Sequence, residues 1–352
     1  MSDRVTMNPY MASDVVDLDS PDDIKLADRM KVGREQILHE LRKVIIGQED
    51  VINQVLNTLF VGGNSLIVGA PGLAKTLLIH TMAQVLQLKF SRIQFTPDLM
   101  PSDITGTDLV QEDAATGRRQ MVFAPGPIFA NIVLADEINR TPPKTQSALL
   151  EAMQEHRVTI QGRTYNLDEP FYVFATQNPI ELEGTYPLPE AQLDRFMYHI
   201  IIEHPPHDEE IDVVRTTTAI QDPKLERPGE RRGSDRVQRL VQEGAGVGAG
   251  DAARARHRAR DAAASEGVAG LREQVGGVRR QRPRGAVLVL GGKARALTSG
   301  RYHVSFDDIR ALAHPVLRHR IITNFHAQSE GVTTDQITDR LLETVPMPRS
   351  GM

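Results

Sequence analysis

The feature that most constrains the fold is a glycine-bearing loop between an apolar run and a helical pattern. The apolar run covers residues 65–68, and Lys75-Thr76 opens the helical pattern of residues 77–83. In such a loop the backbone amides and the helix N-terminus direct positive partial charge at phosphates. Lys75 adds a full charge, and the Thr76 hydroxyl can ligate Mg²⁺. The predicted phosphate-binding set is Gly69, Ala70, Pro71, Gly72, Leu73, Ala74, Lys75 and Thr76, with Ala74 where the generic pattern has its second glycine.

Two carboxylates end a second apolar run further along the chain. Residues 131–135 read as a buried strand, and Asp136 and Glu137 follow it directly. Charge at the end of a buried strand is costly to desolvate unless it has a partner. We therefore predict that Asp136 binds Mg²⁺ through its water shell and that Glu137 is the general base for an attacking water. A chance turn and an exposed acidic strand end are the alternatives for each motif alone, but the two together favour an NTPase.

Length and composition limit the class of protein. With 352 residues the chain can bury a sizeable core and hold two domains plus tails. The net charge of −5 gives no global basic field for nucleic acid. The absence of cysteine excludes disulfides, zinc–thiolate sites and thiol catalysis. No secretory signal or long apolar span is present, so we expect a cytoplasmic protein without membrane insertion.

The order of apolar patterns predicts the domain organisation. Residues 1–30 are polar and acidic and are predicted to be a disordered tail. Residues 31–205 alternate strand and helix patterns, which predicts an α/β core with a mostly parallel sheet. Residues 206–230 are rich in charge and proline and are predicted to mark the boundary of this core. The predicted strands are 64–69, 91–95, 131–136 and 171–176.

These motifs together resemble the MoxR family of AAA+ ATPases, over roughly residues 30–205 and 287–345. Besides the loop, the matching stretches follow the family's order: 135–144, 145–155, 174–179 and 190–196. The resemblance implies an AAA+ P-loop NTPase core with a parallel sheet, followed by a small C-terminal all-α lid domain at 287–345. It also implies ATP and Mg²⁺ as cofactors and a homo-oligomeric ring, expected to be a hexamer. Its expected role is chaperone-like remodelling of a protein partner, such as one with a von Willebrand A domain.

Three further sites follow from the resemblance. Asn178 matches sensor 1, where a neutral amide can hydrogen-bond both the lytic water and a γ-phosphate oxygen; an Asn-Pro turn is compatible with that role. Arg195 matches the arginine finger, which reaches the γ-phosphate held by the neighbouring subunit. A surface ion pair is the alternative for Arg195. Gly47 and Gln48 resemble the segment that lines the adenine, with a hydrophobic helix end as the alternative.

Two extended insertions resemble the hairpins that mark the branch containing MoxR proteins and magnesium chelatase ATPase subunits. Residues 157–167 alternate apolar and polar positions around Gln161-Gly162, which predicts a β-hairpin. Residues 106–125 contain a second extended segment with a polar turn at 113–118. In a ring such hairpins would face the central channel and contact a client. Ordinary surface hairpins are the alternative.

The stretch 231–286 does not fit the rest of the chain. It is rich in arginine, alanine and glycine, and Leu240 and Leu271 are its only leucines. A helical lid needs an apolar stripe, which these residues cannot supply. Our hypothesis for the stretch is a frame error within the linker and lid start at 206–286. The alternatives are a genuine disordered insertion and an RNA-binding arginine tract. The candidates for the lid arginine, sensor 2, are Arg282 and Arg284.

The C-terminal part carries helix signals. Ser305 with Asp308 predicts a capped helix, and Pro315 is expected to break or kink it. We expect a solvated helix face rather than a metal site in the run containing His314, His319 and Arg320.

Other functions stay open from sequence alone. A magnesium-chelatase-like subunit would drive metal insertion, a nucleic-acid motor would need a basic channel, and a scaffold with impaired hydrolysis would bind ATP without turnover.

Overall fold

A parallel sheet forms the centre of the molecule. The computed structural model describes residues 21–112, 119–180, 184–218, 225 and 284–345. Within them a 5-stranded sheet has the order β2-β5-β8-β1-β9, with every neighbouring pair parallel. Its strands are β1 (Ser65–Gly69), β2 (Phe90–Gln94), β5 (Ile132–Asp136), β8 (Tyr172–Gln177) and β9 (Tyr198–Ile202). The predicted α/β class is confirmed, and the predicted strands match the first four of these within a residue or so.

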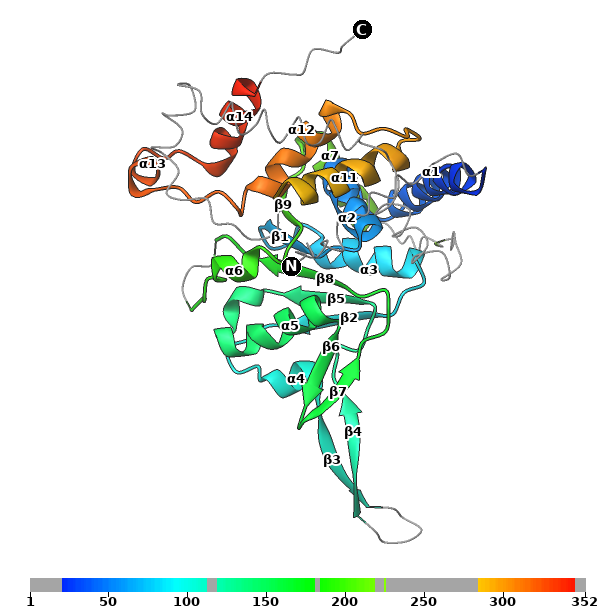
Figure 1. Ribbon diagram of the computed structural model, residues 1–352, viewed down its shortest axis with the longest axis vertical. Helices are drawn as coiled ribbons and strands as arrows, with labels where there is room; N and C mark the ends of the chain where they lie inside the picture. Colours follow the sequence, from blue (N-terminus) through cyan, green and yellow to red (C-terminus); the bar gives the residue numbers. More distant parts are fainter. Residues whose placement is uncertain (1–20, 113–118, 181–183, 219–224, 226–283, 346–352) are drawn as a thin grey trace, which may run out of the picture.

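Helices cover both faces of this sheet (Figure 1). Strand β5 is buried along its whole length, as expected for a parallel strand between two layers. Its side chains alternate, so that Ile132 and Leu134 enter one apolar cluster while Val133 and Ala135 enter the other. The helices around the core are α1 (Pro21–Leu41), α2 (Glu49–Val61), α3 (Lys75–Val85), α4 (Pro101–Thr105), the 3-10 turn η2 (Ile138–Arg140), α5 (Pro143–Glu155), α6 (Glu190–Leu193) and α7 (His207–Thr218).

The sequence prediction missed strand β9. Tyr198, Ile200 and Ile202 are buried, whereas His199 and Ile201 are more accessible, which is the period of two typical of a strand. The segment pairs in parallel with β1, at the edge of the sheet. The tight approach explains Gly69, because a Cβ there would lie 2.7 Å from the carbonyl oxygen of Ile202. The alternation is in burial and not in the residue types, so the signal available in the sequence was the short apolar run of β-branched residues at 200–202.

The N-terminal boundary also differs from the prediction. Helix α1 begins at Pro21, so residues 21–30 are helical where we predicted a tail. Proline is favoured in the first turn of a helix, where its missing N–H has no partner to lose. Met30 is buried in the core at 3% exposure, which anchors this part of α1. Residues 1–20 lie outside the described ranges.

The two predicted hairpins are present. β3 (Gly106–Glu112) pairs antiparallel with β4 (Arg119–Pro125), and β6 (Arg157–Ile160) pairs with β7 (Arg163–Asn166). Gln161 and Gly162 both have positive φ, as the tight turn of the second hairpin requires. The β3–β4 hairpin extends away from the core (Figure 1), and its predicted turn at 113–118 lies outside the described residues.

A helical lid packs at the opposite end of the molecule from the β3–β4 hairpin (Figure 1). It consists of α11 (Arg284–Thr298), α12 (Phe306–Leu317), α13 (Phe325–Ser329) and α14 (Thr334–Thr344). Asn57 of α2 donates from Nδ2 to the Tyr198 hydroxyl at 2.8 Å and to the Gly291 carbonyl at 3.1 Å, which joins the core to α11. A Cβ on Gly291 would lie 2.2 Å from the Tyr198 oxygen, so this docking point requires glycine. None of the described helices is both long and apolar enough to cross a membrane.

The lid confirms one helix signal and corrects another. Ser305 and Asp308 form the predicted capping box at the start of α12. The helix does not break at Pro315 but continues through it to Leu317. Pro315 lies within the last turn and is buried there.

The prediction of a solvated face over His314, His319 and Arg320 was wrong for two of its members. His314 is partly exposed and pairs with Asp339 at 2.8 Å. His319 and Arg320 instead face the core, where burial lowers the pKa of His319 and the Arg320 side chain is 4% exposed. These two residues follow the end of α12, where no helical repeat of apolar residues continues, so the sequence did not show that their side chains face the core. Among the described residues, no group of three or more His, Cys, Asp or Glu side chains is placed to hold a metal ion.

Arg320 fastens the lid to the segment between α6 and β9. Its Nε donates to Asp194 Oδ1 at 2.8 Å, and its Nη2 donates to the Phe196 carbonyl at 2.9 Å. Its Nη1 donates to the carbonyls of Met197 at 3.2 Å and Val316 at 2.6 Å. The guanidinium therefore joins the end of α12 to the residues on either side of position 195.

Arg320→Ala is expected to lower the free energy of unfolding by about 3 kcal/mol, because it leaves Asp194 and several carbonyls without their donor. Urea denaturation of the full chain measures the effect. Arg310→Ala is the matched control, since Arg310 lies on α12, the helix that precedes Arg320, and is exposed. Equal stability of the two variants would show that the contacts of Arg320 contribute nothing net.

Candidate active site

The phosphate-binding loop lies between β1 and α3, at the carboxyl edge of the sheet. Gly72 has φ +84°, and Ala74, the helix N-cap, has φ +55°. Ala74 thus takes the left-handed conformation that the second glycine of the generic motif would favour, at a cost of about 1 kcal/mol. The departure from the generic pattern changes the residue but keeps this backbone shape.

Lys75 lies folded against its own loop. Its Nζ donates to the carbonyls of Gly69 at 2.6 Å and Ala70 at 2.7 Å. Burial lowers the pKa of Lys75, and the nearby carboxylates Asp136 and Glu137 oppose that shift. The ammonium is thereby held by neutral carbonyls in the loop rather than bonded to either carboxylate.

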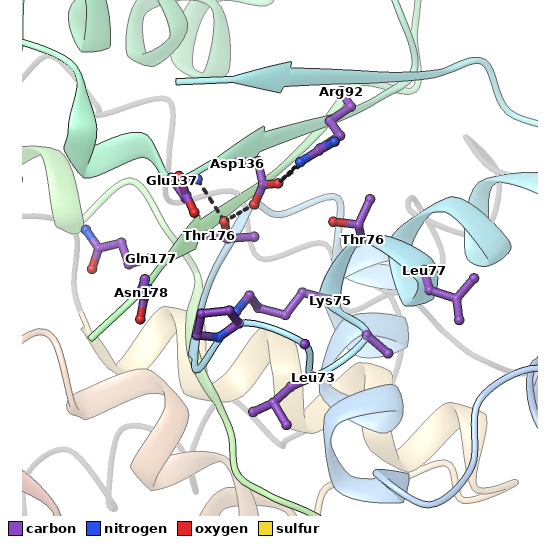
Figure 2. Close-up of a pocket in the computed structure, with 13 residues that line it drawn as sticks. Leu73, Lys75, Thr76, Leu77, Arg92, Asp136, Glu137, Thr176, Gln177 and Asn178 are labelled. Atoms are coloured by element: carbon purple, nitrogen blue, oxygen red, sulfur yellow. Dashed lines mark hydrogen bonds and ion pairs between the residues drawn. The ribbon is translucent and has the colours of Figure 1, made fainter. Parts of the chain in front are cut away.

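A pocket of about 420 Å³ opens beside this loop, a size within the usual range for small ligands. Figure 2 shows the residues that line it, with the Thr76 hydroxyl on the side of α3 that faces Asp136. The lining comes from the loop, the start of α3, strand β2 and the ends of β5 and β8: Pro71, Gly72, Leu73, Ala74, Lys75, Thr76, Leu77, Arg92, Asp136, Glu137, Thr176, Gln177 and Asn178.

Asp136 ends β5 and is held at both carboxylate oxygens. It is 8% exposed. Oδ1 accepts from the Thr176 hydroxyl at 2.5 Å, and Oδ2 accepts from Arg92, at 3.0 Å from Nε and 2.6 Å from Nη2 (Figure 2). The partners come from β8 and β2, the strands on either side of β5. This fixes the orientation of the carboxylate at the pocket wall.

Glu137 follows immediately in the left-handed region, at φ +56°. Its backbone N–H donates to Thr176 Oγ1 at 2.9 Å. Its Oε2 accepts from Gln94 Nε2 at 2.9 Å and pairs with Arg140 Nε at 3.0 Å. Residues of β2 and η2 therefore hold the Glu137 side chain, which lines the same pocket as Lys75.

Asn178 lies one residue beyond β8 and lines the pocket at 7% exposure. Its Oδ1 accepts from the Ile180 amide at 3.1 Å, which is the turn expected of the Asn-Pro sequence. Asn178 therefore forms the Asn-Pro turn and also lines the pocket, and the two readings of this residue from sequence are compatible.

The predicted adenine segment is placed next to the loop but outside the pocket lining. Gly47 and Gln48 both have positive φ, and Gln48 Nε2 donates to the Leu73 carbonyl at 3.4 Å. Glu209 of α7 lies directly over Gly47, because a Cβ there would fall 1.8 Å from its carboxylate oxygen. The adenine-binding role of Gly47 and Gln48 stays a prediction.

One predicted site residue, Arg195, does not line the pocket, and the side chains of the two candidates for the lid arginine lie outside what the structure describes. Arg195 is exposed after α6, where Nε and Nη2 donate to Gln154 Oε1 at 3.2 and 3.1 Å. Arg282 lies outside the described residues, and Arg284 begins α11 with a side chain that is not described. The roles of Arg195 as finger and of either lid arginine as sensor 2 stay predictions.

Sequence reasoning missed Arg92, Gln94 and Thr176. Arg92 and Gln94 are two residues apart on β2, so their side chains lie on the same face, and Gln94 is in register with Asp136. Thr176 was inside a recognised strand but had no assigned role, although it bonds both members of the Asp-Glu pair. Polar residues at the ends of neighbouring strands were the available signal.

Fold and site together define a P-loop nucleotide-binding protein with an AAA+ core and a helical lid. Residues 64–198 match the model of the ATPase family associated with various cellular activities (AAA), and residues 282–341 match the AAA lid domain.

Individual relatives narrow the assignment. Protein YeaC of Bacillus subtilis is 39% identical over 313 residues, covering 88% of this chain and 93% of YeaC. Chaperone MoxR1 of Mycobacterium tuberculosis is 36% identical over 324 residues, covering 90% of this chain and 82% of MoxR1. The crystal structure of a protein from Cytophaga hutchinsonii, described as an ATPase, superposes with a TM-score of 0.84 at 35% sequence identity, covering 95% of this chain and 100% of that chain. The chain belongs to the MoxR family of AAA+ ATPases.

Proposed function

We propose that the chain hydrolyses ATP with Mg²⁺ in a ring of identical subunits and uses that reaction to remodel or activate a protein partner. The observation that supports hydrolysis is the convergence of the loop, the Asp-Glu pair and Asn178 on one pocket. A P-loop lysine, two carboxylates and a neutral amide at the ends of adjacent strands are the groups that phosphoryl transfer to water needs.

The side chains present suit a magnesium–nucleotide ligand. Thr76 and Asp136 offer the hard oxygen donors that Mg²⁺ prefers, and would hold it. Bound there, Mg²⁺ would supply charge neutralisation on the β- and γ-phosphates. Lys75 turns from its loop carbonyls to the phosphates, Glu137 takes a proton from the attacking water, and Asn178 orients that water by hydrogen bonding.

The position of Arg195 supports action between subunits. Its guanidinium is exposed, donates to the uncharged side-chain amide of Gln154 on α5, and does not line the pocket of its own chain. An arginine supplied to a neighbour's γ-phosphate needs this kind of accessible position. We infer a homo-oligomeric ring, with six subunits as the expected number.

The β3–β4 hairpin supports contact with a protein partner. Leu109 opposes Val122 and Val110 opposes Met121, so both faces of the ribbon carry apolar pairs. These side chains are 37–64% exposed, although an isolated two-stranded ribbon gains little stability in water. A partner with a von Willebrand A domain completes the proposal and rests on the resemblance alone, whereas the cytoplasmic location stays the expectation drawn from the sequence.

Steady-state phosphate release from Mg²⁺-ATP tests the proposal. Lys75→Ala is expected to lower nucleotide affinity at least about tenfold and to abolish release, because it removes the charge that meets the β- and γ-phosphates. Lys89→Ala is the matched control, since Lys89 is an exposed lysine directly before β2. Phosphate release that is absent from the wild-type chain, or unaffected by Lys75→Ala, would overturn the proposed ATPase.

A further inference from the structure

Arg92 forms an ion pair with Asp136 in the pocket, at 2.6 Å from Nη2 to Oδ2. The motifs that define the family do not include this arginine. Of the two cationic side chains among the described residues lining the pocket, Lys75 bonds carbonyl oxygens and Arg92 bonds a carboxylate. Arg92 Nη2 also donates to Gln94 Oε1 at 2.6 Å, which holds the guanidinium from a second side. The Arg92 side chain is 48% exposed, against 11% for Asp136, so the arginine bridges the buried carboxylate and the open pocket.

The hydrogen bonds leave Asp136 little free acceptor capacity. Both donors of Arg92 converge on Oδ2, and a carboxylate oxygen has about two lone-pair positions. Oδ1 already accepts from Thr176. The carboxylate that the proposed function assigns to the metal is thus largely saturated, and its charge is balanced by a guanidinium at contact distance.

We propose that Arg92 is the resident counter-charge of Asp136 and that it sets the Mg²⁺ concentration at which the nucleotide site fills. This inference rests on the proposed function. Arg92 has to release at least part of Oδ2 before Asp136 can serve a divalent cation, because a neighbouring guanidinium weakens the attraction of the carboxylate for cations. Arg92 also adds positive charge to a pocket for polyphosphate, which favours nucleotide binding without metal. Arg92 is thus a positioning residue that weakens Mg²⁺ binding at Asp136 and strengthens nucleotide binding in the absence of metal.

Binding of fluorescently labelled ADP to the full chain, followed by anisotropy from EDTA through a series of free Mg²⁺ concentrations, separates the two effects. Arg92→Gln is expected to lower the half-saturating Mg²⁺ concentration about tenfold, the size of one charge-assisted hydrogen bond. The same variant is expected to bind labelled ADP about threefold more weakly in EDTA, because the pocket loses a charge. If Arg92 acted only in folding, the variant would bind labelled ADP more weakly both in EDTA and in Mg²⁺.

Two variants complete the test. Arg92→Lys keeps the charge but cannot place two donors on Oδ2, so it should retain the wild-type affinity in EDTA and need less Mg²⁺ than wild type. Arg119→Gln is the control, because Arg119 also pairs with a carboxylate, Glu112, on a strand outside the pocket. Its curves should match those of the wild-type chain.

Three results would overturn the inference. An unchanged Mg²⁺ requirement in Arg92→Gln would mean that the ion pair does not compete with the metal. A higher requirement would mean that Arg92 orients Asp136 for the metal instead. Equal weakening at every Mg²⁺ concentration would make Arg92 a phosphate ligand or a structural residue. If the wild-type chain binds no labelled ADP at any Mg²⁺ concentration, the proposed function itself fails and this inference falls with it.

Discussion

Glu137→Gln is expected to bind ATP with near wild-type affinity and to lower phosphate release about a hundredfold or more. The substitution keeps the size of the side chain and one oxygen that can accept from Gln94 or Arg140, but it removes the basicity that a general base needs. Because Glu137 lines the pocket beside Asp136 and Asn178, the loss should appear in kcat and not in nucleotide affinity. Phosphate release and labelled-ATP binding, measured on the same preparation, separate the two quantities.

Glu155→Gln is the matched control for this substitution. Glu155 also pairs with an arginine, Arg157 at 3.2 Å, but it lies at the end of α5, outside the pocket lining. Its phosphate release should equal that of the wild-type chain. If Glu137→Gln keeps more than about a third of the wild-type rate, the general base lies elsewhere, since a true base contributes at least about a hundredfold.

The sequence was most informative where the predicted site residues are neighbours in the chain. The loop at 69–76 and the pair Asp136-Glu137 are each continuous, so their chemistry can be read without knowing the strand order. The structure then places both at one pocket, together with Asn178. Apolar runs predicted most strands of the sheet for a similar reason, since each run lies within one continuous segment.

The sequence was least informative where a contact depends on which strands are neighbours. Arg92 reaches Asp136 because β2 adjoins β5, and Thr176 reaches it because β8 lies on the other side. The sequence of β2 or of β8 does not by itself indicate that these strands lie on either side of β5. The lid shows the same limit, because Arg320 meets Asp194 across 126 positions of sequence, and only the docking of α12 against β9 brings them together.

Arg195→Ala is expected to lower phosphate release about a thousandfold without a comparable loss of nucleotide affinity, because a finger stabilises charge that develops in the transition state. The residue is well placed to be presented to a neighbour. Arg320 holds the carbonyl of Phe196 and the side chain of Asp194, so the backbone on both sides of Arg195 is fixed while its guanidinium stays exposed. Arg215→Ala, at an exposed arginine of α7 paired with Asp212, is the matched control and should be active.

Mixing two inactive variants distinguishes a finger that acts between subunits from one that acts within its own chain. An Arg195→Ala subunit keeps an intact Glu137, and a Glu137→Gln subunit keeps an intact Arg195. In mixed rings some interfaces therefore join an intact base to an intact finger, and phosphate release should recover above that of either variant alone. If Arg195 served the pocket of its own chain, every site in the mixture would lack one of the two groups. A mixture that stays as inactive as its components, after the subunits have been shown to exchange, would contradict action between subunits.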